Sequence, residues 1–109
     1  MKNKEIIVFS TCPDPECGRA LARSLVENRA AACVNVLPGV MSVYQWKGTT
    51  QEDSECLLMI KSTMDRMDSL ASQIEELHPY ELPEVVAVPV SGGLPAYLDW
   101  VRQSVTDGN

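Results

Sequence analysis

Residues 31–46, AACVNVLPGVMSVYQW, form the stretch that decides the fold. Its valines recur on either side of Pro38-Gly39, a pattern typical of a long β-strand with a bend or bulge in its middle. Residues 55–61 form a second apolar run, and residues 47–51 between the two runs predict a loop. The stretch therefore predicts one arm of a long antiparallel hairpin.

The segment before the hairpin predicts a strand followed by a helix. Residues 6–10 are β-branched, aromatic or small, and the strand ends before the breaker Pro13. Asp14 is suited to cap the helix and Pro15 to occupy its first position, while Asn28 is a plausible end. The apolar residues between them recur at helical spacing.

The segment after the hairpin repeats this order. Ser62-Thr63 predicts the cap of a second helix, which ends at Pro79 because proline cannot continue the hydrogen-bond ladder. Residues 85–90 predict a fourth strand. After Gly92-Gly93, one last helix is indicated by an apolar face made of Leu94, Tyr97, Leu98, Val101 and Val105.

The order of elements predicts an α+β fold. A β-α-β-β-α-β succession with an extra C-terminal helix is the ferredoxin-like sandwich, and its 109 residues fit a single domain, residues 1–109. The predicted third and fourth strands are apolar on both faces. Helices cover only one face of such a sheet, so we expect a second subunit to cover the other, in a homo-oligomer.

Charge and hydropathy narrow the range of partners. The formal net charge is −6, from 15 acidic and 9 basic residues, which disfavours a phosphate backbone, so nucleic acid is not an expected partner. No apolar run approaches the roughly 18 residues that span a bilayer, and the start of the chain lacks the pattern of a signal peptide. We therefore expect a cytoplasmic protein without a membrane partner.

The chain contains four cysteines, at positions 12, 17, 33 and 56. In a cytoplasmic protein they are expected to be reduced thiols, and no CxxC pair is present. Cys17 falls near the start of the first predicted helix, where the helix dipole favours a thiolate. A thiol oxidoreductase that uses Cys12 and Cys17 is therefore kept as an alternative.

The richest polar chemistry lies in residues 78–84, HPYELPE, which include the only histidine. The ring nitrogens of His78 suit copper, zinc or nickel, and neighbouring glutamates could join it as ligands. The alternative is structural. A histidine at a helix end interacts favourably with the dipole, and Pro79 simply ends the helix.

Four ordered motifs carry a family resemblance from about Ile6 to Val105: AACVN (31–35), SVYQWKG (42–48), IKS (60–62) and HPYELPE (78–84). With the closing segment YLDW (97–100), they are similar to the CutA family, the divalent-cation tolerance proteins. The resemblance implies ferredoxin-like subunits in a tight homotrimer, found in the cytoplasm, structurally similar to PII signalling proteins and without an established catalytic activity. It also implies a link to tolerance of copper and other divalent metals.

The resemblance further implies candidate site residues. In some bacterial members copper is attributed to a cysteine and two adjacent histidines; Ser10 and Leu77 stand at two of these positions here, which leaves His78 as the candidate metal ligand. The family pattern also suggests that Trp46, Lys61, Tyr80 and Glu84 meet in a ligand cleft between subunits. The alternative for these four is an interface of packed rings and a paired lysine.

The function expected from these observations is not enzymatic. We expect a homotrimer that acts in the response to divalent metal ions, with copper or another divalent metal as the candidate cofactor. The alternative function is a PII-like sensor that binds a small molecule at the subunit clefts.

Overall fold

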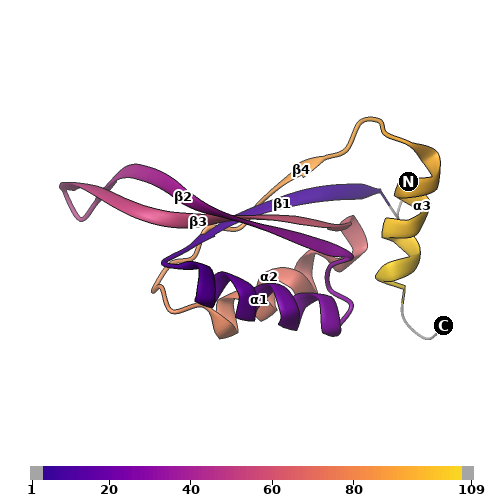
Figure 1. Ribbon diagram of the computed structural model, residues 1–109, viewed down its shortest axis with the longest axis horizontal. Coiled ribbons are helices and arrows are strands. Elements are labelled where there is room, and N and C mark those ends of the chain that lie inside the picture. Colours follow the sequence, from indigo (N-terminus) through magenta and orange to yellow (C-terminus); the bar gives the residue numbers. More distant parts are fainter. Residues whose placement is uncertain (1–3, 107–109) are drawn as a thin grey trace.

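The computed structural model describes residues 4–106, which fold into one four-stranded sheet with helices packed against it (Figure 1). The strands are antiparallel in the order β2-β3-β1-β4. The predicted α+β succession with a C-terminal helix is confirmed. The elements are β1 (Glu5–Cys12), α1 (Pro15–Glu27), β2 (Cys33–Trp46), β3 (Thr49–Thr63), the 3₁₀ turn η1 (Met64–Arg66), α2 (Met67–Leu77), β4 (Val86–Pro89) and α3 (Pro95–Ser104).

The core lies between the sheet and the two helices α1 and α2, which cover the same face (Figure 1). Every second residue of β1 is buried, as expected for a strand with one face on a core. Burial of a leucine or isoleucine side chain stabilises a fold by about 1.5–3 kcal/mol, so this layer holds the subunit together. Its fully buried members include Leu25, Leu58, Ile60, Leu70 and Ile74.

Helix α1 begins and ends as its sequence predicts. The Asp14 carboxylate accepts a hydrogen bond of 2.8 Å from the backbone N–H of Cys17, and Pro15 occupies the first helical position. Asn28 is the C-terminal cap. An acidic cap at the positive end of the dipole is one of the stronger local determinants of a helix start.

The predicted cap of the second helix is only partly right. Ser62 belongs to β3, where its hydroxyl donates a 2.6 Å hydrogen bond to the carbonyl of Ala30. Thr63 precedes a 3₁₀ turn and donates to Asp65, and α2 starts after that turn. The reason is that β3 stays paired with β1 as far as Thr63, so the helix cannot start earlier. Its predicted end, before Pro79, is confirmed.

The hairpin between β2 and β3 is longer and tighter than predicted. Residues 49–51 are not in a loop: they pair with residues 44–46, and only Lys47 and Gly48 form the turn. Both turn residues have positive φ, 53° and 82°, as a two-residue type I′ turn requires. Thr49 and Thr50, which the sequence predicted to be in a loop, lie in an extended strand, a conformation that β-branched side chains favour.

The predicted interruption at Pro38-Gly39 is a β-bulge. The register between β2 and β3 shifts between Leu37 and Val40, and Gly39 has a φ of 79°. One extra residue in β2 reverses which side chains of that strand point to each face of the sheet. Ser42 and Tyr44 therefore face the side of the sheet opposite the helices.

That opposite side, called here the open face, has neither α1 nor α2 over it, and its central part on β1, β3 and β4 is apolar (Figure 1). Phe9 lies between its partners Met59 and Val86, and Ile7 pairs with Val88 on the same face. The side chains of Val86 and Val88 are 53% and 40% exposed. The second apolar face predicted from the sequence is thus present. Among residues 4–106, no helix is long and apolar enough to cross a membrane.

Candidate functional site

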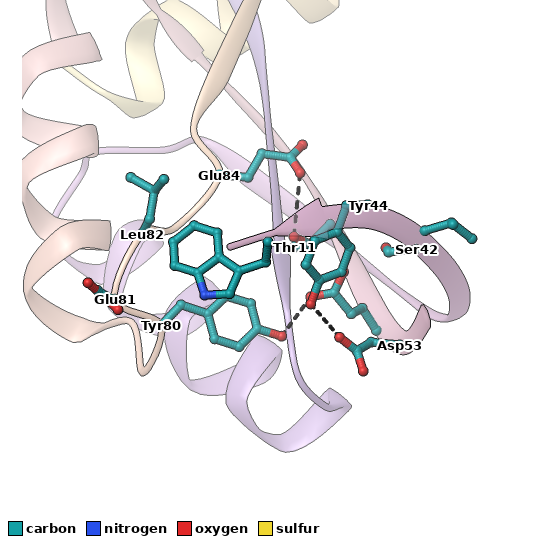
Figure 2. Close-up of a pocket in the computed structure, with 11 residues that line it drawn as sticks. Thr11, Ser42, Tyr44, Asp53, Tyr80, Glu81, Leu82 and Glu84 are labelled. Carbon is teal, nitrogen blue, oxygen red and sulfur yellow. Dashed lines mark hydrogen bonds between the residues drawn. The ribbon is translucent and has the colours of Figure 1, made fainter. Parts of the chain in front are cut away.

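A cavity of about 620 Å³ lies between the outer half of the hairpin and the connection from α2 to β4 (Figure 2). Side chains from β2, β3, the end of β1 and the connection between α2 and β4 line it. Aromatic and acidic residues dominate this lining: Tyr44, Trp46, Tyr80, Asp53, Glu55, Glu81 and Glu84. No lysine or arginine is found among the described residues that line it.

Strand pairing explains why these side chains meet. Ser42 is the direct partner of Asp53, and Tyr44 is that of Gln51, so Tyr44 and Asp53 are diagonal neighbours on one face. Glu55 follows two residues further along β3 on the same face. The bulge is essential to this arrangement, because without the extra residue Tyr44 would point to the other face.

Two tyrosines hold two of the carboxylates. The Tyr80 hydroxyl donates a 2.6 Å hydrogen bond to Glu55, and the Tyr44 hydroxyl donates to Asp53. Burial is the main cause that raises the pKa of Tyr80, and the hydrogen bond to Glu55 raises it further. The hydrogen bond to Asp53 is the main cause that raises the pKa of Tyr44. Both phenols therefore stay protonated at neutral pH. Tyr44 and Tyr80 direct their hydroxyl groups toward the same end of the cavity, near Asp53 (Figure 2).

Glu55 is the most buried acidic group of the cavity, with 6% of its surface exposed. Among residues 4–106, no lysine or arginine forms an ion pair with it. A buried carboxylate without a cation is costly unless hydrogen bonds compensate, and one such bond comes from Tyr80. At the cavity rim, Glu84 accepts a longer bond of 3.5 Å from the Thr11 hydroxyl.

His78 lies beside this site, with its ring centroid 4.6 Å from that of Tyr80, and is 8% exposed. Its Nε2 is 2.7 Å from the carbonyl oxygen of Thr11, and its Nδ1 accepts a hydrogen bond of 3.1 Å from the backbone N–H of Tyr80. These contacts fit the neutral tautomer protonated at Nε2, which donates to the carbonyl and accepts from the amide. His78 therefore ties the turn after α2 to β1 and fixes the backbone of Tyr80.

The comparisons with known proteins agree on one family. The model of the CutA1 divalent ion tolerance protein family matches residues 6–104. This chain belongs to the CutA1 family. The resemblance noted from the sequence motifs is thereby confirmed, and the comparisons favour this family over PII signalling proteins.

Relatives of this CutA1 chain come from bacteria, animals and plants. It is 45% identical to the divalent-cation tolerance protein CutA of Thermus thermophilus, over 92% of this chain and 97% of that protein. It is 47% identical to human protein CutA over 91% of this chain but 57% of the human protein. It is 44% identical to the chloroplastic CutA of Arabidopsis thaliana, and spans about half of that protein's length, 54%.

Solved CutA structures have the same fold as this chain. The crystal structure of CutA from Xylella fastidiosa has a TM-score of 0.92 at 41% identity and covers 94% of this chain and 99% of that one. CutA1 from Oryza sativa has a TM-score of 0.93 at 40% identity, with 98% of each chain covered. An archaeal relative, from Archaeoglobus fulgidus, is described as periplasmic, so location varies within the family.

The residues of one CutA1 subunit do not fit a metal centre at His78. A histidine binds a metal through the lone pair of a ring nitrogen, yet the Nδ1 of His78 accepts from an amide and its Nε2 contacts a carbonyl. Ser10 is fully buried, and Leu77 has no ligating atom. Among residues 4–106, no group of three or more His, Cys, Asp and Glu side chains is arranged to hold a metal ion.

The predicted ligand cleft is brought together in part. Trp46, Tyr80 and Glu84 line the large cavity, but Lys61 of the same subunit does not. Lys61 is six residues from Glu55 along β3, roughly 20 Å away at the rise of an extended strand. Its amino group donates to Asn35, and it lines a separate cavity of about 170 Å³ beside α3.

Sequence reasoning missed three residues that shape the cavity, namely Tyr44, Asp53 and Glu55. Tyr44 lies within the motif at residues 42–48, which was used only for the family resemblance, and Asp53 and Glu55 belong to none of the motifs. They meet because of the hairpin register, and the signal that could have found them is the bulge at Pro38-Gly39 combined with strand alternation.

The thiols show no sign of activation. The four cysteines are free, and Cys12 is fully buried. Burial, with a smaller effect of the neighbouring Cys17, raises the pKa of the Cys12 thiol to about 12. Burial also raises the pKa of Cys17, which outweighs its place near the start of α1. A nucleophilic thiol needs a lowered pKa, so these values argue against the oxidoreductase alternative.

Cys12 is expected to react with iodoacetamide far more slowly than a free cysteine. Raising the pKa from 9.0 to about 12 lowers the thiolate fraction at pH 8 on the order of a thousandfold. The same shift makes the free energy of unfolding depend on pH. The contribution of the protonated Cys12 thiol is fully present below pH 9. It is lost as the pH rises toward 12, because only the thiol of the unfolded chain ionises in that range. Peptide mass spectrometry after timed alkylation measures the rate. Alkylation of Cys12 at the rate of free cysteine would show an accessible, activated thiol.

Proposed function

We propose that this CutA1 chain acts in cellular tolerance of divalent cations, copper among them, as a cytoplasmic homotrimer without catalytic chemistry of its own. The observation that carries the proposal is the family match over residues 6–104, which includes every strand and helix that shapes the cavity and the open face. Four free thiols fit a reducing compartment such as the cytoplasm.

The open face supports the trimer. Its apolar row runs across three strands, from Val86 through Phe9 to Met59, and neither α1 nor α2 covers it. Apolar faces of this kind in small subunits mark protein contacts. The two edges of the sheet, β2 and β4, differ in length and sequence, and contacts between such unlike surfaces form a ring when the rotation between subunits closes. A cyclic trimer satisfies both features.

His78 is assigned to the fold in this proposal. Its ring joins two backbone segments, so the proposed role in metal tolerance does not depend on coordination by His78. A nucleotide ligand of the kind bound by a PII-like sensor is not supported, because the cavity is lined by acidic groups that repel phosphate.

Expression of this chain is expected to restore growth at elevated copper in a bacterial strain that lacks its own CutA protein. The strain carrying an empty vector serves as the reference, and growth rate is measured over a series of copper concentrations. A Val86→Asp variant, which places a charge on the open face, is expected to restore growth much less at equal expression. The proposal fails if the wild-type chain gives no growth advantage over the empty vector.

A further inference from the structure

We propose that Cys12 and Cys17 form a two-coordinate site for a soft monovalent metal ion, Cu(I), at the start of α1. The site goes beyond the proposed role in tolerance of divalent cations, and it uses neither His78 nor the cavity beside the hairpin. Three features support the assignment, namely the contact between the two thiols, the room that Gly18 leaves for the Cys12 sulfur, and the small number of ligands available there.

The end of β1 and the first turn of α1 bring the two thiols together. Cys12 is the last residue of β1, and its side chain is fully buried. Its thiol lies 3.7 Å from the Asp14 carbonyl oxygen, and a hydrogen bond links it to the Cys17 side chain. Both cysteines are free, so two unbonded sulfurs are held within hydrogen-bonding reach of each other. Cys17 is only half-buried, which gives an ion access to the pair.

Gly18 leaves room beside the Cys12 sulfur. A Cβ atom at this position would lie 3.1 Å from the Cys12 Sγ and 3.1 Å from a methyl carbon of Val36, closer than side chains normally approach. A glycine inside a helix is destabilising relative to alanine, because it loses more conformational freedom on folding. Helix α1 therefore gives up stability at a position where a side chain would press on that sulfur.

The two thiols select the class of ion. Thiolates are soft ligands, which favour Cu(I) over hard ions such as Mg²⁺ and Ca²⁺. A structural Zn²⁺ site takes four ligands, yet among residues 4–106 no group of three or more His, Cys, Asp and Glu side chains is arranged to hold a metal ion. Cu(I), by contrast, is stable in a line between two thiolates. Metal–thiolate bonds of about 2.3 Å place those sulfurs roughly 4.6 Å apart, slightly further than two hydrogen-bonded thiols.

Binding exchanges protons for the ion. Each thiol loses one proton as its sulfur bonds to Cu(I), so one Cu⁺ replaces two protons and the product carries one negative charge. The positive end of the α1 dipole lies next to this charge and stabilises it. Burial is the main cause that raises the pKa of Cys12 and of Cys17. Asp14 and Cys56 oppose ionisation of both thiols, and Glu55 opposes that of Cys12. The affinity for Cu(I) is therefore expected to rise with pH.

Anaerobic titration with Cu(I) held by bicinchoninate tests the site, since the protein must take the ion from a competing chelator. The assembled wild-type protein is used with all its cysteines reduced. We expect one Cu(I) per chain, with an affinity that rises about a hundredfold per pH unit near pH 7 because two protons leave. No uptake from the chelator would overturn the assignment, and so would an affinity that does not change with pH.

Variants locate the ion. Cys17→Ser removes one sulfur at a half-buried position, and we expect it to weaken Cu(I) binding at least about a hundredfold. Cys33→Ser is the matched control, because Cys33 is also half-buried but begins β2, where it pairs with Lys61, and this variant should bind as wild type. Cys12→Ala removes the second sulfur and is expected to weaken binding as much, with circular dichroism to show that it is folded. Unchanged affinity in Cys17→Ser would place the ion elsewhere and overturn the inference, whether or not Cys12→Ala folds.

X-ray absorption on the copper-loaded protein counts the ligands. Two sulfur ligands are expected, and a third sulfur or any nitrogen or oxygen ligand would overturn the two-coordinate site. These measurements use purified protein, so they are independent of the growth assay. A chain that binds Cu(I) in this way but fails to restore growth at elevated copper would leave the inference standing and refute only the proposed function.

Discussion

A Val86→Asp variant is expected to be monomeric in solution, with the mass of a single chain, 12.0 kDa. Val86 is the partner of Phe9 on the open face, and 53% of its side chain is exposed in the isolated subunit. An aspartate is therefore tolerated by the free subunit. In the trimer the same carboxylate would be buried among apolar side chains, which costs several kcal/mol at each of the three contacts.

The matched control is Val26→Asp. Val26 lies on α1, on the helical side of the sheet, and its side chain is 41% exposed, so the same chemical change is made away from the open face. Size-exclusion chromatography with light scattering gives the mass of both variants. A Val86→Asp protein that stays fully trimeric would show that the open face is not where subunits meet.

Replacing His78 with alanine is expected to destabilise the protein by about 2–4 kcal/mol and to leave its affinity for Cu(II) unchanged. The variant leaves two backbone groups, the Thr11 carbonyl and the Tyr80 N–H, without their hydrogen-bond partner. Each such group costs about 1–3 kcal/mol of stability when it is buried and unpaired. Urea unfolding at one chain concentration measures the stability, since the unfolding of an oligomer depends on concentration.

The neighbouring Leu77→Ala variant is the control for this experiment. Leu77 is 50% exposed, so its truncation should change the stability by less than about 1 kcal/mol. Calorimetric titration with Cu(II) is performed on wild type and both variants. Loss of Cu(II) binding in His78→Ala at unchanged stability would identify His78 as a metal ligand rather than a residue that shapes the turn.

Local signals in the sequence predicted most of the fold. Asp14 and Pro15 mark the start of α1, and Pro79 marks the end of α2, because each acts on the backbone next to it. The hairpin loop was predicted too long. Nothing local indicates that Lys47 adopts a positive φ, a conformation that costs energy for a non-glycine residue and is imposed by the pairing of the two long strands.

The site was harder to predict than the fold because it depends on register. Tyr44 and Glu55 share a face only through the extra residue at the bulge, and a shift of one residue would separate them. Lys61 was grouped with the cleft through the family resemblance, but within a subunit the strand carries it roughly 20 Å from Glu55. His78 is surrounded by glutamates in sequence, yet its hydrogen bonds go to the backbone.

The mass of the wild-type protein in solution tests the proposed homotrimer most directly. Light scattering on the eluting peak is expected to give three times the 12.0 kDa chain mass, with no change on dilution through the micromolar range. The open face would then be covered in every subunit. A wild-type protein that elutes with the mass of one chain would contradict the homotrimer and, with it, the role assigned to the open face.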